Sequence, residues 1–504
     1  MGTMNTFLMV GNNEAVSLNS IPVVPFETLR RSVIEAVGAG ARISALPVWQ
    51  VAGKAPLQVL AVLSFPKAGE LGLMAGDLPD RWLSLTPDCH AAHWFEREIA
   101  EQWGVIPEGH PWLKPIRFQP PRRASNSGME APAIGDTDFF SMTDHGSHEV
   151  AVGPVHAGVI EPGHFRFLCH GETVYHLEIS LGYQHRGIER AMIGGPTPRS
   201  LHYMETLAGD TSIGHGMAYS HAVEALAGIR ISPRAEVIRT VAIELERIAN
   251  HTGDLGAMAG DVGFLPTLNY CGRIRGDVLN MTAVLCGNRF GRDLIRPAGV
   301  KWDLNSELVD DLLTRLDSVE KDVTGAVTLM LDSPSVLARL ESTGTVTADT
   351  ARRIGLVGVA ARACGLNRDV RSEFPYGLYR FAQLPVSTWD SGDCFGRAHV
   401  RWMEIQASID FIRHRLRELP SGPIERDPSA LKSDSLTVSL VEGWRGEICH
   451  VAGTDHEGRF AFYKVVDSSF HNWFGLALAL RHQEISDFPL CNKSFNLSYC
   501  GHDL

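Results

Sequence analysis

The chain has 504 residues, of which 44% are hydrophobic and 21% charged, the composition of a globular protein that can bury a sizeable core. Its 46 Lys and Arg against 58 Asp and Glu give a formal net charge of −12, which argues against a nucleic-acid-binding domain with its basic surface. Its 9 cysteines are odd in number and widely spread, which favours free thiols over a disulfide framework.

The first part of the chain predicts a small α/β domain over residues 1–118. Apolar residues recur at helical spacing over residues 26–37. They alternate with other residues over 57–65, which is typical of a half-buried strand. A second helix is expected from 91 to 103, with Gly104 as its C-cap.

The composition then changes, and a larger second module is expected beyond the change. Residues 119–148 are rich in Pro, Ser, Gly, Asn and Asp, which indicates a linker. Residues 150–179 predict short strands with turns, the pattern becomes helical from about Tyr183, and residues 436–466 return to a strand-like pattern. We therefore expect an α+β protein in which residues 149–504 form a mostly helical domain with a strand-rich entrance.

Many motifs in the chain resemble two adjacent core subunits of respiratory complex I. Those of the smaller subunit are residues 96–98, 104–105 and 109–113. The larger subunit is the homologue of the [NiFe] hydrogenase large subunit. Its motifs match residues 153–156, 161–166, 182–189, 244–251, 290–300, 362–365 with Arg371 and 375–376, and 469–472. Their number and order imply a fused two-module subunit, similar to the large subunits of hydrogenase-4 and formate hydrogenlyase in group 4 of the [NiFe] hydrogenases.

The resemblance also implies where nickel ligands would stand. A [NiFe] site needs two C-x-x-C pairs, because only soft sulfur ligands hold that cluster. The positions of the first pair are occupied by Ala208 and Thr211, and those of the second by Ser498 and Gly501. Cys500 alone cannot rebuild a four-thiolate site. We therefore expect no metal and no cofactor in this chain, and Fe–S clusters only on partner subunits.

The quinone-binding signature of complex I is also incomplete in this chain. The tyrosine that complex I presents to the quinone head group aligns with Gly209, beside Asp210. The histidine that partners the quinone lies in a loop that matches residues 159–164, where this chain is two residues longer and His164 is the candidate substitute. Both catalytic signatures of this fold are therefore altered.

A polar set remains where the active-site cleft is expected. It contains six candidate catalytic residues and one further carboxylate: Glu161, His164, His185, Arg186, Asp210 and His215, with Glu189. Buried groups of this kind can titrate near neutral pH, so one interpretation is a proton relay or a polar substrate pocket. Glu161 is the best-motivated member, since the resemblance implies that the glutamate of this Glu-Pro motif carries protons. The other interpretation is that these groups only satisfy one another's charges and hydrogen bonds in a cavity that no longer has a catalytic function.

The resemblance implies a peripheral subunit at the cytoplasmic face of the inner (plasma) membrane. Its expected partners are an Fe–S-carrying small subunit, a ferredoxin-like subunit and antiporter-like membrane subunits, and no nucleic acid. It would take part in NADH dehydrogenase-like electron transport only within that complex, with quinone or an unidentified acceptor as substrate. The alternative is a non-catalytic scaffold that couples a redox module to the membrane arm. No G-x-G-x-x-G or Walker A motif supports a nucleotide pocket in this chain.

Overall fold

The N-terminal module is built on a six-stranded sheet in the computed structural model, which describes residues 7–49, 57–122, 132–142, 145–156, 158 and 160–504. Its strands are β1 (Leu8–Val10), β3 (Val23–Val24), β4 (Arg42–Ala45), β5 (Val48–Trp49), β6 (Gln58–Phe65) and β7 (Glu70–Asp77). The path runs β1-β7-β6-β4, β3 adds to β7 in parallel, and β5 pairs with β6. The longest pairing, β6 with β7, is antiparallel and extends from Gln58↔Asp77 to Phe65↔Glu70.

Two helices of this module agree closely with the sequence prediction. Helix α1 (Phe26–Gly38) packs on the sheet, and α2 (His93–Trp103) follows a short 3-10 turn (His90–Ala92) and ends at Gly104 in the left-handed conformation. The prediction that β6 is half-buried is wrong, since every residue of β6 after Gln58 is buried. The reason is that the second module also packs against this sheet, as the contacts of β4 with two strands of that module show.

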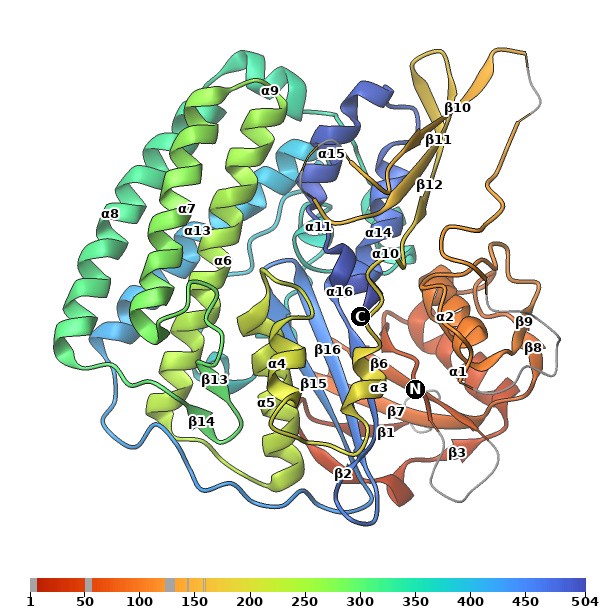
Figure 1. Cartoon of the computed structure of the whole chain (residues 1–504), viewed down its shortest axis with the longest axis horizontal. Helices are drawn as coiled ribbons and strands as arrows, with labels where there is room; N and C mark the ends of the chain where they lie inside the picture. Colours follow the sequence, from red (N-terminus) through yellow and green to blue (C-terminus); the bar gives the residue numbers. More distant parts are fainter. Residues whose placement is uncertain (1–6, 50–56, 123–131, 143–144, 157, 159) are drawn as a thin grey trace.

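The second module begins with a three-stranded antiparallel sheet, β10 (Ser147–Val152), β11 (His164–His170) and β12 (Thr173–Ser180), which stands apart at the upper right of Figure 1. A bundle of long helices forms the opposite side of the molecule (Figure 1). Its members are α6 (Pro233–Asp261), α7 (Leu265–Cys286), α8 (Ser306–Leu331) and α13 (Cys394–Arg417). Helix α6 packs against both α7 and α13 and is therefore the buried axis of the bundle.

A four-stranded sheet between these parts joins the two modules. Its order is β17-β16-β15-β2, with β15 (Ser435–Gly443), β16 (Gly446–Thr454) and β17 (Phe460–Val466) from the second module and β2 (Ala15–Ser17) from the first. The β2–β15 pairing is antiparallel, with Ser17 opposite Ser435. The strands predicted over 436–466 are confirmed, and the addition of an N-terminal strand to them was not predicted.

The C-terminal helices bring the end of the chain into the centre of the molecule (Figure 1). They are α14 (Ser468–Ala479), α15 (Phe488–Phe495) and α16 (Tyr499–Asp503). The Arg117 guanidinium of the first module donates to the His502 carbonyl at 2.9 Å, and the backbone amides of Arg186 and Gly187 donate to the Leu504 carbonyl.

Shorter elements complete the fold. They are α3 (Ile188–Met192), α4 (Ser200–Glu205), α5 (Ser212–Ala227), α9 (Pro334–Leu340), α10 (Ala348–Arg353), α11 (Gly358–Arg362), α12 (Val370–Glu373), β8 (Arg81–Leu83), β9 (Ile106–Glu108), β13 (Ile295–Arg296), β14 (Gly299–Val300) and the 3-10 turns Leu18–Ser20, Gly377–Phe381 and Ile485–Asp487. The predicted α+β class is confirmed. All 9 cysteines are free.

A buried ion network ties the helical bundle to the central sheet. The Arg362 guanidinium reaches the carboxylates of Glu404 at 2.6 Å and of Glu442 at 2.7 Å. Arg371 pairs with Asp369 at 2.6 Å and with Glu244 at 3.2 Å. All of these side chains are at most 3% exposed. We refer to these six residues as the core ion network.

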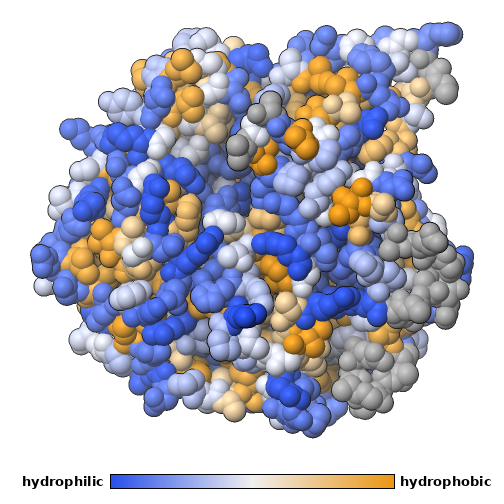
Figure 2. Space-filling model, viewed as in Figure 1, coloured by the Kyte–Doolittle hydropathy of each residue, from blue (hydrophilic) through white to orange (hydrophobic). Residues whose placement is uncertain are grey.

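The surface is mixed in character. Figure 2 shows hydrophilic side chains over most of one face, interrupted by small hydrophobic patches. In the part of the chain that the structure describes, no helix combines the length and the apolar character needed to cross a bilayer.

Candidate functional site

The four positions of the implied nickel ligands lie around the starts of two helices. Thr211 is the N-cap of α5 and Ser498 is the N-cap of α16. The Asp467 carboxylate lies between these segments. It contacts His215 Nε2 of α5 at 3.0 Å, and it lies against Gly501 of α16. The structure therefore brings together the two segments in which the resemblance implies the ligand pairs.

The residues at these positions do not fit a four-thiolate centre. Ala208, Thr211, Ser498 and Gly501 offer no sulfur. The Ser498 hydroxyl instead accepts the Gly501 amide at 2.9 Å and so caps α16. A Cβ atom added at Gly501 would lie 2.8 Å from Asp467 Cγ, so this carboxylate fills the space that a cysteine side chain would need.

An arginine and an aspartate fill one side of the region around the implied ligand positions, which we call the central site. Arg445, in the tight connection between β15 and β16, binds both oxygens of Asp210 at 2.7 Å and lies 3.2 Å from the Thr211 hydroxyl. Burial favours the neutral form of Asp210, but the Arg445 charge and hydrogen bonds outweigh it and lower the pKa of this carboxyl. The Arg445 guanidinium also stacks on the Trp444 ring at 3.9 Å.

A chain of four buried side chains fills the other side of the central site. Asp467 Oδ2 lies 3.0 Å from His215 Nε2, and His215 Nδ1 lies 3.1 Å from His450 Nε2. His450 Nδ1 in turn lies 2.8 Å from the Tyr463 hydroxyl. None of the four residues is more than 3% exposed. We call Asp467–His215–His450–Tyr463 the buried relay.

The pKa shifts indicate how protons are distributed along the buried relay. Burial opposes ionisation of Asp467, but the hydrogen bond and charge of His215 outweigh it and lower its pKa to about 2. Burial and the neighbouring His215 lower the pKa of His450 well below its ordinary value, so His450 is neutral. Since Asp467 only accepts, His215 Nε2 donates to it. In the bonds His215–His450 and His450–Tyr463, the tautomers of the two rings decide which atom donates.

A buried carboxyl group of α6 lies at the edge of the central site. Glu246 accepts the backbone amides of Ile213 at 2.7 Å and Gly214 at 3.1 Å, at the start of α5. Burial raises the pKa of Glu246 to about 8, because these bonds offset only part of the desolvation. The sequence prediction did not include this residue among the titrating groups.

Two of the predicted residues, Glu161 and Arg186, bond mainly to backbone atoms. The Glu161 carboxylate accepts the amides of Tyr499 at 3.1 Å and Cys500 at 3.2 Å, and so holds the start of α16. Arg186 donates to the carbonyls of Thr206 at 2.7 Å and Leu207 at 2.8 Å. Both therefore position the segments that carry Asp210 and Ser498. The predicted role of Glu161 as a proton carrier stays a prediction.

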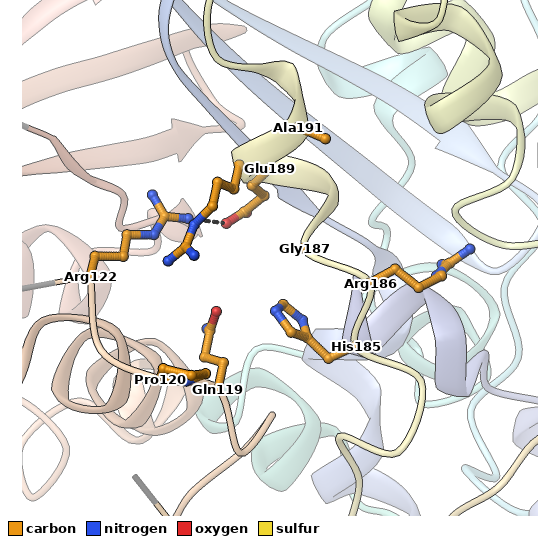
Figure 3. Close-up of a pocket in the computed structure, with 9 residues that line it drawn as sticks. Gln119, Pro120, Arg122, His185, Arg186, Gly187, Glu189 and Ala191 are labelled. Carbon is orange, nitrogen blue, oxygen red and sulfur yellow. Dashed lines mark hydrogen bonds and ion pairs between the residues drawn. The ribbon is translucent and has the colours of Figure 1, made fainter. Parts of the chain in front are cut away.

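His185 and Glu189 face a different space, a cavity of about 450 Å³ at the junction of the two modules. Its walls are Gln119, Pro120, Arg122, His185, Arg186, Gly187, Glu189, Arg190 and Ala191. In Figure 3 the side chains of His185 and Gln119 point into this space, whereas Arg186 points away from it. Glu189 pairs with Lys464 at 2.8 Å and with Arg122 at 3.3 Å, and burial lowers the pKa of His185.

His164 has its own surroundings on β11. Its Nδ1 lies 3.0 Å from the Gly153 carbonyl, Arg166 donates to its Nε2 at 3.4 Å, and its ring contacts Phe139. These contacts involve none of the other five predicted catalytic residues within the described ranges. Val159 of the predicted quinone loop lies outside the described residues, so that alignment stays a prediction.

Sequence reasoning missed the residues that complete the central site: Arg445, His450, Tyr463 and Asp467. They lie more than two hundred residues beyond Asp210 in the chain and outside every segment that matched the family's ligand motifs. One signal was available, because buried charged side chains at Glu442, Arg445 and Glu447 and a histidine at His450 lie within a short strand-forming stretch. That signal marks a buried polar group and does not reveal its partner.

Two family profiles match separate parts of the chain. Residues 60–122 match "Respiratory-chain NADH dehydrogenase, 30 Kd subunit". Residues 261–438 match "Respiratory-chain NADH dehydrogenase, 49 Kd subunit". The two matches occur in the order that the sequence motifs predicted.

Relatives over longer stretches come from hydrogenases and from complex I. The carbon monoxide-induced hydrogenase of Rhodospirillum rubrum is 30% identical over 69% of this chain and 97% of its own length. Formate hydrogenlyase subunit 5 of Escherichia coli is 28% identical over 83% of this chain and 76% of its own length. NADH-quinone oxidoreductase subunit 4 of Thermus thermophilus is 34% identical over 55% of this chain and 68% of its own length. The resemblance inferred from the motifs is thereby confirmed.

Proposed function

Because the chain belongs to the family of complex I 49 kDa subunits and related hydrogenase large subunits, we propose that it is the large subunit of a membrane-associated oxidoreductase without a nickel centre. It would lie peripherally at the cytoplasmic face, between Fe–S-carrying subunits and antiporter-like membrane subunits. The names of the relatives support this setting, since they include a "Membrane-bound hydrogenase subunit alpha" and NADH-quinone oxidoreductase subunits.

The proposal rests on the side chains that fill the central site. Sulfur ligands are replaced by the Asp210–Arg445 pair and the buried relay. Such groups cannot hold [NiFe], but they can hold and pass protons. We propose quinone as the electron acceptor. Its reduction to quinol takes two electrons, supplied by the Fe–S partner, and two protons from solvent, which we propose pass through the buried relay that contains His215.

The test uses the purified assembly and a soluble quinone analogue. His215→Gln should lower the rate of quinone reduction by about 10²-fold, the scale of a lost general acid, with the assembly intact. The matched control is His221→Gln on the same helix, since His221 is also buried and contacts Tyr376 instead of the relay. Stoichiometric nickel in the assembly, or an unchanged rate in His215→Gln, would contradict the proposal.

A scaffold function is the second candidate. One observation favours it: Glu161 and Arg186, two residues of the family motifs, are occupied by backbone hydrogen bonds. A scaffold would leave quinone reduction unchanged in both histidine variants. Assembly would then depend on the docking surfaces instead, and variants of the relay would leave it intact.

A further inference from the structure

Two cysteines from different helices meet beneath a loop of the helical domain. Cys394 is the first residue of α13, and Cys491 lies in α15. The Cys491 thiol donates a hydrogen bond to the Cys394 sulfur. The loop at Gly344 closes over the pair, because a Cβ atom added there would lie 2.6 Å from Cys491 Sγ. Neither cysteine has a role in the proposed function.

A buried arginine stands beside this pair. Arg397, one turn further along α13, is 0% exposed and donates to Ser494 Oγ and to the carbonyls of Gly392 and Gly344. These acceptors are neutral. Among the residues that the structure describes, no carboxylate pairs with Arg397, and the ionisable atom it contacts is Cys394 Sγ, at 3.4 Å. A buried guanidinium requires a counter-charge, so the contact favours a thiolate at Cys394.

Cys394 lies in the first turn of α13, where the helix dipole favours negative charge. The Asp393 carboxylate caps the same turn by accepting the Gly396 amide at 2.8 Å, so Cys394 shares this helix end with an existing anion. Burial opposes ionisation of Cys394, but the hydrogen bond from Cys491 and the Arg397 charge outweigh it and lower its pKa to about 6. Burial raises the pKa of Cys364, which lies in the same neighbourhood, to about 11. Two thiols of one region therefore differ in ionisation.

We propose that Cys394 and Cys491 form a redox-active dithiol that hydroperoxides oxidise to a disulfide between α13 and α15. The Cys394 thiolate attacks hydrogen peroxide, the O–O bond breaks, hydroxide leaves, and a sulfenic acid forms. The Cys491 sulfur then attacks the Cys394 sulfur, the S–O bond breaks, and water leaves with the thiol proton. The two sulfurs lose two electrons in total, and the peroxide gains them.

The position of the dithiol gives the modification a structural consequence. Helix α15 ends at Phe495, and the next residue, Asn496, accepts the Arg445 guanidinium on its carbonyl and donates to Asp254 at 2.6 Å. A bond at Cys491 would therefore fix the segment that leads into the central site. This link is independent of the identity of the electron acceptor.

The experiment exposes the purified full-length protein to hydrogen peroxide and maps cysteine peptides by mass spectrometry without reduction. We expect a Cys394–Cys491 cross-link to form at least about tenfold faster than Cys364 is oxidised, because the thiolate is the reacting species. Cys364→Ser should leave the cross-linking rate unchanged. In Cys491→Ser the cross-link is lost, and Cys394 should be trapped by a sulfenic-acid reagent.

The arginine variants separate charge from access. Arg397→Gln should slow the modification of Cys394 about tenfold, whereas Arg397→Lys should retain most of the rate, since the cation determines the thiolate fraction. If Arg397→Gln fails to fold, the pH dependence in the unmodified protein decides, with the rate falling below about pH 6 as Cys394 is protonated. The proposal is overturned if Cys394 reacts no faster than Cys364, or if full oxidation yields no cross-link.

Discussion

The core ion network and the central site are both buried and polar, but they are organised differently. In the core ion network each arginine contacts at least two carboxylates, as Arg362 does with Glu404 and Glu442. In the central site Arg445 forms an ion pair with one carboxylate, that of Asp210, and the Asp467 carboxylate contacts the His215 ring. Several charges thus share their partners in the first region, where burial and Asp369 raise the pKa of Glu442 to about 7, whereas in the second region Asp467 is paired with an imidazole.

This difference indicates that the fold does not depend on the residues at the implied nickel-ligand positions. The core ion network joins the bundle to the central sheet without involving any implied nickel-ligand position. The central site could therefore change its chemistry while the surrounding architecture stayed the same. Variants of the two regions should accordingly fail in different ways.

The largest effect is expected from Arg362→Met in the core ion network. It leaves the carboxylates of Glu404 and Glu442 buried without their shared cation, which should cost about 3–5 kcal/mol of folding free energy. Thermal unfolding and the yield of soluble protein measure it. The control is Arg339→Met, whose partner pair with Asp487 is solvent-accessible and should contribute about 1 kcal/mol or less. An equal loss of folding free energy in the two variants would contradict the expectation that the buried pairs contribute more than the exposed pair.

The next effect is a pH dependence at the edge of the central site. Because the pKa of Glu246 is raised to about 8, its contribution to stability is fully present below about pH 4.5 and is lost as the pH rises to about 8. Glu246→Gln cannot ionise, so the melting temperature of the variant relative to the parent should rise by roughly 2–4 °C between pH 5 and pH 8.5. A difference that does not change with pH would show that Glu246 is ionised throughout this range.

A smaller effect is expected where a cysteine is placed at an implied nickel-ligand position. Gly501→Cys places its Cβ atom 2.8 Å from Asp467 Cγ and should cost about 1–3 kcal/mol by overpacking. Adding Asp467→Ala should recover part of this loss, since the two sites are in contact and their effects are not additive. Denaturant unfolding of the two single variants and the double variant measures the coupling. Simple additivity would mean that the carboxylate does not occupy the cysteine's space.

The smallest effect is expected from Tyr463→Phe at the end of the buried relay. The change removes the hydrogen-bond partner of His450 Nδ1 and should cost about 1–2 kcal/mol, the desolvation of one unsatisfied nitrogen. Denaturant unfolding measures this loss, and Tyr219→Phe, a buried tyrosine of the same cluster, is the control.

Sequence reasoning was most accurate where local pattern determines the structure. Helix α1 was predicted over 26–37 and spans Phe26–Gly38, since its apolar spacing and terminal glycine are local signals. The burial of β6 was wrong, because the covering layer comes from the other module. Element type thus followed from neighbours in the chain, whereas burial depended on distant segments.

The candidate site was predictable only in part for the same reason. Asp210 and His215 were identified through the resemblance, and the structure places both in the central site. Their partners Arg445, His450 and Asp467 come from a turn, a strand and a helix cap that no local pattern connects to α5. His164 and His185 were grouped with them from the motifs, but they contact different surroundings.

The pairing of β2 with β15 has a consequence for how the protein is made. Ser17 can pair with Ser435 only after about 420 further residues have been synthesised. This synthesis takes roughly 20–80 s at ordinary elongation rates. Until then β2 lacks the strand with which it pairs, and its backbone hydrogen-bonding groups stay exposed on the nascent N-terminal module. The central sheet therefore closes late in translation, and a ribosome that stalls before β15 leaves a product whose first module is unfinished.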